Sequence, residues 1–161
     1  AYLKLLPLSN NRILFDIVHP QVPREYFSAF RTAIESSLVY GQVLVFNLQR
    51  IDNPDSVAEL ADFLLRQQGV NYVLGMGWYK GMQILSMRSL IPEAKLGKVI
   101  QQMVEGLGTA GGHGMVAGGQ IREMAEDEGA QKELERLLTR RLFKALELES
   151  VPGEPLLAES S

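Results

Sequence analysis

Cysteine is absent from the 161-residue sequence, and histidine occurs only twice. The absence of cysteine excludes disulfide bonds, thiolate metal sites and a cysteine nucleophile, and it fits a reducing cytoplasm. With so few histidines, a metal site would have to be built from carboxylates, and we expect no metal site in this chain. The sequence also offers no pair of catalytic carboxylates, no activated serine and no Gly-Lys-Ser phosphate loop. We therefore expect no catalytic residue here.

A surplus of positive charge and a long apolar run are missing as well. The 16 Lys and Arg residues are outnumbered by 19 Asp and Glu residues, so the net charge is −3 at pH 7. This balance argues against a broad basic surface for nucleic acid but leaves room for a small basic pocket. No apolar run approaches the roughly 18 residues of a membrane helix, and the first residues lack a basic leader. We expect a soluble, cytoplasmic protein that binds no membrane.

Hydrophobic periodicity predicts the secondary structure along most of the chain. Hydrophobic residues make up 46% of the sequence, which is enough for one compact core. Apolar positions at helical spacing predict helices over residues 23–39, 54–68, 92–107 and 127–146. Short apolar runs predict strands over residues 42–48, 71–77, 82–89 and, briefly, 120–124. Gly41 is expected to cap the first helix, and the glycine-rich stretch 108–119 is expected to be a loop.

The order of these elements predicts an α/β (α+β) fold, a single domain with a mixed sheet of about four to five strands flanked by helices. The strands at 42–48 and 71–77 are joined through a helix, so we expect them to be parallel. The strands at 71–77 and 82–89 flank the turn residues WYKG and are expected to be antiparallel. Loops at the strand ends are the natural positions for a ligand.

The stretch GTAGGHGMVAGG, residues 108–119, is the first candidate for chemistry. Consecutive glycines can turn successive backbone N–H groups into one concavity, and a short helix beginning near His113 would add its dipole, so an anion is the expected guest. His113 can donate to that anion or transfer a proton. The alternative is a glycine-rich turn in which His113 bonds a neighbouring carbonyl.

Arg88 is the second candidate. On a strand, Ser86 and Arg88 point to the same face. The planar guanidinium suits a phosphate, and the alternative is a surface salt bridge; proximity to the glycine stretch would favour the phosphate. Asp62, between apolar neighbours of the predicted helix 54–68, is expected at the boundary of that helix's apolar face.

Together the two motifs resemble the C-terminal domain associated with the Asp-His-His phosphoesterases, the superfamily of RecJ nucleases, nanoRNase-type oligoribonucleases, cyclic dinucleotide phosphodiesterases and some pyrophosphatases. That family has a strand ending in a Ser-x-Arg-Ser-like pattern, then a helix, then a Gly-Gly-His segment with a nearby Ala-Gly. The matching residues here are Ser86, Arg88, Ser89, Gly111, Gly112, His113, Ala117 and Gly118. Thr109 and Ala110 stand where many relatives have a longer glycine run.

The resemblance implies boundaries along the chain and separate positions for the metal and the substrate. It implies a linker and helical segment after an Asp-His-His domain at 1–41 and the substrate-binding domain at 42–148. The Pro, Gly and Ser content of residues 149–161 separately predicts a flexible tail. The resemblance also implies that Mn or Mg belongs to the preceding domain, because the Asp-His-His triplet does not occur here. The residues implied to hold a phosphate or its nucleotide are Arg88, Gly111, Gly112 and His113, with Ser86 and Thr109 beside them.

The function that the resemblance implies is that of the substrate-binding domain of a metal-dependent phosphoesterase, of oligoribonuclease or exonuclease type, acting on short oligonucleotides or related phosphodiesters. The implied partners are a nucleotide or short single-stranded nucleic acid and the preceding domain of the same chain, with a homodimer as a further candidate. Alone, the chain is expected to hydrolyse nothing. Two alternatives stay open: a non-catalytic nucleotide-sensing or nucleic-acid-binding module, and a glycine turn on a dimerising scaffold.

Overall fold

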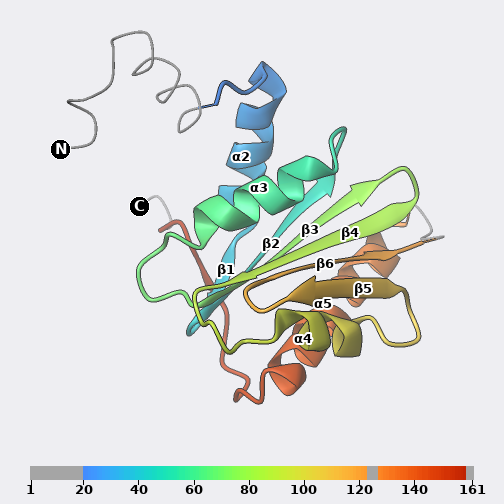
Figure 1. Cartoon of the computed structure of the whole chain (residues 1–161). Coiled ribbons are helices and arrows are strands. Elements are labelled where there is room, and N and C mark those ends of the chain that lie inside the picture. The colour runs from blue at the N-terminus through green and yellow to red at the C-terminus, as the bar shows by residue number, and fades with distance from the viewer. Residues whose placement is uncertain (1–19, 123–126, 159–161) are drawn as a thin grey trace, which may run out of the picture.

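The computed structural model describes residues 20–122 and 127–158 (Figure 1). They form one seven-stranded sheet with the strand order β5-β6-β4-β3-β2-β1-β7. The strands are β1 (Leu38–Tyr40), β2 (Val43–Arg50), β3 (Tyr72–Tyr79), β4 (Met82–Ser89), β5 (Thr109–His113), β6 (Val116–Ile121) and β7 (Glu154–Pro155). The helices are α2 (Arg24–Ser36), α3 (Asp55–Leu64), α4 (Leu96–Met103) and α5 (Glu128–Ala145). Parts of the predicted linker (1–19), last strand (123–124) and tail (159–161) lie outside the described residues.

The predicted mixed sheet is confirmed, with more strands than the four to five expected. Strands β2 and β3 are parallel, β3 and β4 are antiparallel, and every other pair in the sheet is antiparallel. The helix predicted to reach Val39 ends at Ser36, because Leu38–Tyr40 pairs with β2 as β1. Gly41, expected as a helix cap, forms the turn between β1 and β2 with a φ of +64°. Strand β7 falls within the predicted flexible tail and pairs with β1.

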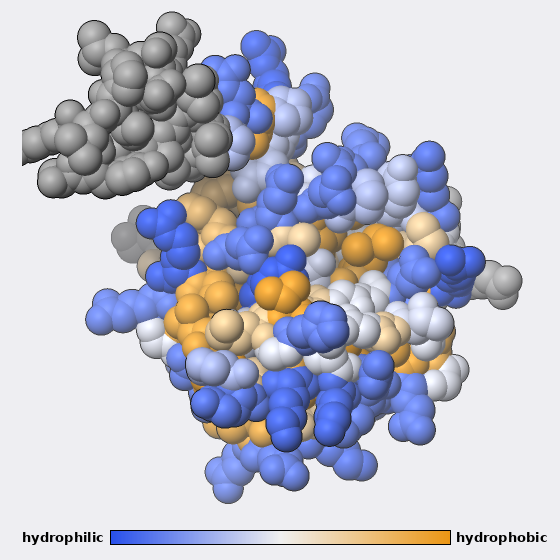
Figure 2. All heavy atoms as spheres, in the orientation of Figure 1, coloured by the Kyte–Doolittle hydropathy of each residue, from blue (hydrophilic) through white to orange (hydrophobic). Residues whose placement is uncertain are grey.

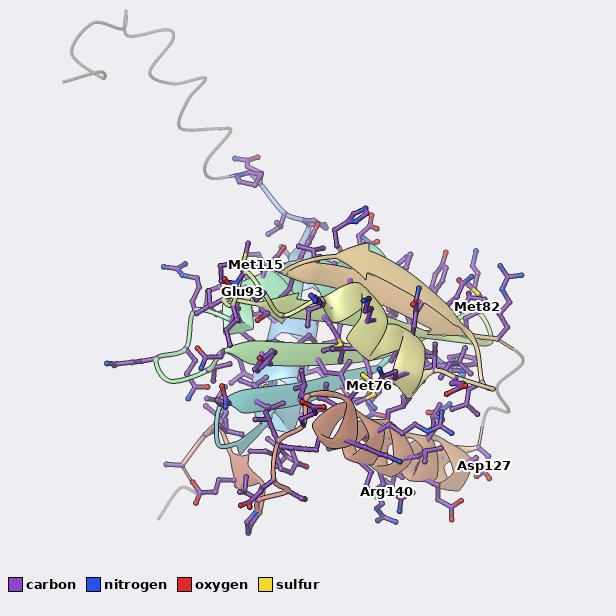
Figure 3. All side chains as sticks on the ribbon, turned by 60° about the horizontal axis from the view of Figure 1, so that its bottom comes forward. Met76, Met82, Glu93, Met115, Asp127 and Arg140 are labelled. Carbon is purple, nitrogen blue, oxygen red and sulfur yellow. The ribbon has the colours of Figure 1, made fainter. Side chains whose placement is uncertain are left out.

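Helices cover both faces of the sheet (Figure 1), and each face has its own apolar core. Helices α2 and α3 pack on β2, β3 and part of β4, around Phe46, Val57 and Leu60. Helices α4 and α5 pack on the other face, and Figure 3 shows Met76 between them. Within the described parts of the chain, no helix is long and apolar enough to span a bilayer.

Glycines in β3 let α3 lie close to the sheet. A Cβ atom at Gly75 would overlap the ring of Phe46, and one at Gly77 would lie 2.8 Å from Ile51 Cδ1 and 2.9 Å from Val57 Cγ2. Because no side chain stands in this space, α3 packs against both β3 and β4. The same helix brings the carboxylate of Asp62 to the end of β4.

The edge strand β5 is covered by α4, which leaves no long free sheet edge there. Gly97 of α4 lies against the peptide of Gly112, where a Cβ atom would overlap the carbonyl oxygen. One helical turn further along α4, Gln101 Nε2 donates to the carbonyl oxygen of Ala110 at 3.3 Å. The contact with α4 therefore holds the strand that carries most of the glycine motif.

Candidate functional site

The glycine stretch forms an antiparallel hairpin, so the prediction of a loop is wrong, and the short helix considered near His113 is not formed. Residues Thr109–His113 form β5 and residues Val116–Ile121 form β6, with Gly114 in the turn at a φ of +47°. Pairing between the strands uses backbone groups that the loop prediction left free for an anion. Glycine is tolerated here because β4 on one side and α4 on the other support the hairpin.

The register of the hairpin brings the two sequence motifs together in three cross-strand rows. One row joins Arg88, Val116 and His113, the next joins Ser86, Gly118 and Gly111, and the third joins Ile84, Gln120 and Thr109. Residues opposite one another in a sheet share a face. Five of the six predicted site residues therefore lie on one face of β4, β6 and β5, and only Gly112 has its Cα hydrogens toward the other.

We call this surface the open face: the nine residues of these three rows. Helices α2 and α3 cover the same side of the sheet over β2, β3 and part of β4, but they do not extend over β6 and β5 (Figure 1). In Figure 2 pale, near-neutral residues lie near the middle of the molecule among orange hydrophobic ones, with mostly hydrophilic surfaces above and below. The open face is thus a part of the sheet that the fold leaves accessible to a ligand.

The glycines of the motif fall into two classes. A Cβ atom at Gly111 would meet nothing within 4 Å, and one at Gly118 would make only an ordinary contact of 3.5 Å with Leu85 O. A Cβ atom at Gly112 would overlap Val116 O and Ala117. Packing therefore explains Gly112, whereas nothing in the described fold requires glycine at Gly111 or Gly118. Their effect is to leave bare peptide groups at the centre of the open face.

Arg88 is held at the edge of the open face by three hydrogen bonds. Its Nε donates to Asp62 Oδ1 at 2.7 Å, and its Nη1 donates to Met87 O at 2.9 Å and to Ala117 O at 3.4 Å. The Arg88 side chain is 14% exposed and that of Asp62 is 62% exposed. The salt-bridge alternative for Arg88 is therefore observed, and Arg88 also lies against the glycine hairpin, which was the condition expected to favour a phosphate.

His113 is exposed at the end of β5, in the row of Arg88. No hydrogen bond joins its imidazole to another described residue, so the alternative in which it bonds a neighbouring carbonyl is not observed there. Ser86 is buried beneath the face, 7% exposed. Ser89 has a structural role instead, because its Oγ accepts from Ile91 N at 3.0 Å and its N–H donates to Met115 O in the hairpin turn.

Two adjoining hollows follow the open face. The Arg88 hollow, about 270 Å³, is lined by Ser86, Arg88, Gly111, Gly112, His113, Val116, Ala117 and Gly118. The Thr109 hollow, about 480 Å³, is lined by Ile84, Thr109, Ala110, Gly111, Gly118, Gly119 and Gln120. The glycine pair Gly111 and Gly118 belongs to both, so a ligand can lie across it from one hollow into the other.

A larger hollow, about 560 Å³, lies between α5 and β1 and contains none of the predicted site residues. Lys132, Arg136 and Arg140 line it together with Glu135, whose carboxylate accepts from Asn47 Nδ2 at 3.3 Å. Burial, and then the negative charge of Glu135, raise the pKa of the Tyr40 hydroxyl in its wall. This α5 hollow is the natural rival to the open face.

Metal ligands do not gather in residues 20–122 or 127–158: no group of three His, Asp or Glu side chains there could hold an ion. Asp62, the acid at the open face, is engaged with Arg88. The site therefore offers the guanidinium of Arg88 and the imidazole of His113, two donors that suit the binding of an anion.

No known family model matches the chain, and no curated protein sequence matches it. The crystal structure of an exopolyphosphatase-related protein from Bacteroides fragilis matches 84% of this chain with a TM-score of 0.60, at 14% sequence identity. The chain therefore shares its fold with part of that protein. This likeness agrees with the fold that the sequence resemblance implied. The chain spans 40% of the length of that protein.

Two further solved structures are similar to parts of the chain. The C-Ala domain of alanyl-tRNA synthetase from Aquifex aeolicus matches 64% of this chain and 97% of its own, with a TM-score of 0.47 and 18% identity. PggH, a pGpG-specific phosphodiesterase from Vibrio cholerae, matches 84% of this chain and 43% of its own, with a TM-score of 0.44 and 16% identity.

Sequence reasoning missed Gln120, Ile84 and the pairing role of Asp62. A signal for the first two was present: Gly114 as the first of two residues between TAGGH and VAGGQI fits a two-residue hairpin turn. Such a turn pairs His113 with Val116 and, by register, Thr109 with Gln120. Asp62 and Arg88 are 26 residues apart in the sequence, and no local pattern predicts their contact.

Proposed function

We propose that the open face binds a phosphate-bearing nucleotide, and that the chain is the substrate-binding domain of a metal-dependent phosphoesterase acting on short oligonucleotides or related phosphodiesters in the cytoplasm. The observation that carries this proposal is the register, which sets Arg88 and His113 in one row beside the bare pair of Gly111 and Gly118. An exposed imidazole and a guanidinium are a donor set that suits phosphate oxygens, and the glycine pair leaves room beside them.

The two hollows suggest how such a ligand lies. The phosphate occupies the Arg88 hollow, where Nη2 of Arg88 and the imidazole of His113 donate to its oxygens. The sugar and base continue over the glycine pair into the Thr109 hollow, where the Gln120 amide and the Thr109 hydroxyl offer polar contacts. His113 is four positions along β5 from Thr109, a distance of about 14 Å, which accommodates one nucleotide along the strands.

The role of these residues is to hold and orient the ligand and to neutralise part of its charge. The described residues do not fit a metal site, and we propose that Mn or Mg is bound by a preceding Asp-His-His domain in a longer protein. We expect no hydrolysis by this chain alone. Two or three charge-assisted hydrogen bonds of about 1.5 to 3 kcal/mol each, less the free energy lost on association, correspond to a dissociation constant of about 1 mM.

The proposal is tested by titrating the chain with a 5′-phosphorylated dinucleotide and with the same dinucleotide lacking that phosphate, following the His113 imidazole signals by NMR. We expect saturation at millimolar concentrations for the phosphorylated ligand and weaker binding for the other. Equal binding of both ligands would contradict a role for the 5′-phosphate, and imidazole signals that stay still would contradict the contact with His113.

A side chain placed at Gly111, in the centre of the open face, is expected to block the ligand without unfolding the protein. In Gly111→Val, the side chain stands in open space and suits a strand, so the melting temperature is preserved while affinity for the phosphorylated dinucleotide falls at least about tenfold. Gly111→Ala, with a single methyl group, is expected to give a smaller loss. Full affinity in the valine variant would mean that the ligand does not cross the glycine pair.

A further inference from the structure

Asp62 and Arg88 form an ion pair between two layers of the fold. Asp62 lies on α3, above the sheet, and Arg88 lies near the end of β4. Their Oδ1 and Nε atoms are 2.7 Å apart. Most of the Asp62 carboxylate faces solvent, whereas most of the Arg88 side chain is buried. The carboxylate can therefore move away into water, while the guanidinium stays where it is.

The hydrogen bonds of Arg88 show which part of the guanidinium Asp62 occupies. Arginine has five N–H groups, and Nη1 of Arg88 is committed to the carbonyls of Met87 and Ala117. No described residue accepts from Nη2. The Nε–H and the adjacent Nη2–H point the same way and form the edge that binds a carboxylate or phosphate through two parallel bonds. Asp62 takes half of that edge.

The two backbone bonds also bear on what Asp62 does. Met87 O and Ala117 O, on neighbouring strands, fix the guanidinium plane without help from the carboxylate. Asp62 is then unnecessary for orientation, but its negative charge lies where a phosphate oxygen would bind. Its charge also acts on α2, since burial and then the carboxylates of Glu59 and Asp62 raise the pKa of the Tyr26 hydroxyl.

We propose that Asp62 is an internal competitor of the ligand: it occupies the Nε edge of Arg88 in the free protein, is displaced by the phosphate, and so lowers the affinity of the open face. This inference rests on the proposed function. An exchange of one anion for another keeps Arg88 paired in both states. It also lets the ligand leave readily, which suits a domain that releases short products.

The test is Asp62→Asn, with inorganic phosphate and the 5′-phosphorylated dinucleotide as probes. Because the pair is partly exposed and screened, we expect both probes to bind about threefold to fivefold more tightly, with a gain that shrinks as salt is added. Glu59→Gln is the matched control, since it removes the same charge from an exposed residue one turn earlier on α3 and should leave affinity unchanged. In the unsubstituted chain, the Asp62 carboxyl ¹³C signal should move as the probe binds.

The outcomes separate the two proposals. Unchanged or weaker binding by Asp62→Asn, with wild-type binding that still depends on Arg88, overturns the competitor role alone, and weaker binding would assign Asp62 to positioning. No binding of either probe to either protein overturns the proposed function and this inference with it. If Glu59→Gln increased the affinity for the probes as much as Asp62→Asn does, the effect would come from the overall charge of the protein. That result would also overturn the competitor role of Asp62.

Discussion

Replacing Arg88 by glutamine is expected to weaken binding of the 5′-phosphorylated dinucleotide by about tenfold to a hundredfold. A hydrogen bond to a charged group contributes about 1.5 to 3 kcal/mol, and Arg88 is the cation that the register places in the row of His113. Asp62, which loses its partner in this variant, is mostly exposed and is hydrated instead, so the fold should persist. The measurement is an NMR titration of both proteins, with the melting temperature recorded for each.

Two companion variants make this result specific. Arg31→Gln removes the same charge from an exposed residue of α2 that pairs with Glu35, away from the open face, and should bind as the wild type does. Arg88→Lys keeps the charge but loses the planar fork, and it should recover only part of the affinity. If Arg31→Gln weakened binding as much as Arg88→Gln does, the loss would come from long-range charge. Arg88 would then no longer be assigned as the cation that binds the phosphate.

Alanine at Gly97 is expected to lower the free energy of unfolding by about 2 to 3 kcal/mol. This sign opposes the usual trend, because glycine to alanine within a helix normally stabilises it by up to about 1 kcal/mol. Here the added methyl group would overlap the carbonyl oxygen of Gly112, and backbone on both sides leaves no side chain to move away. Either α4 separates from β5 or the hairpin shifts.

Urea denaturation of Gly97→Ala beside Gly129→Ala checks this expectation. Gly129, in the first turn of α5, has room for a Cβ atom, the nearest atoms being the Asp127 carboxylate oxygens at 3.6 and 3.9 Å. Gly129→Ala should be neutral or slightly stabilising. Equal stability of both variants would show that α4 does not rest on the β5 backbone as described.

The centre of the fold could be predicted from sequence because its signals are local. Apolar runs of strand length and a helix opening at Asn53 and Pro54 predict β2, α3 and β3, and Asn53 Oδ1 does accept from Asp55 N at 3.0 Å. The glycine hairpin could not be predicted from hydropathy, since glycine carries no apolar periodicity and the strand exists through its neighbours β4 and α4. Strands β1 and β7 are short, and β7 depends on pairing with β1, which is distant in sequence.

The candidate site divides in the same way. Arg88, His113 and Gly111 were singled out from residue type and from the family resemblance, and the structure brings them to one face. Gly112 belongs to the packing against Ala117, which no glycine pattern distinguishes from a ligand contact. The position of Asp62 depends on how closely α3 approaches the sheet, and that distance is set by Gly75 and Gly77 rather than by anything near Asp62.

The central claim, a phosphate on the open face, is tested most directly by mapping backbone amide shifts in a ¹H–¹⁵N NMR titration with the 5′-phosphorylated dinucleotide. We expect the largest shifts on Ser86, Arg88, Gly111, His113 and Gly118, with saturation at about millimolar ligand. Shifts that gather instead around Tyr40, Thr139 and Arg140 of the α5 hollow, or an unchanged spectrum at about 10 mM ligand, would contradict the claim.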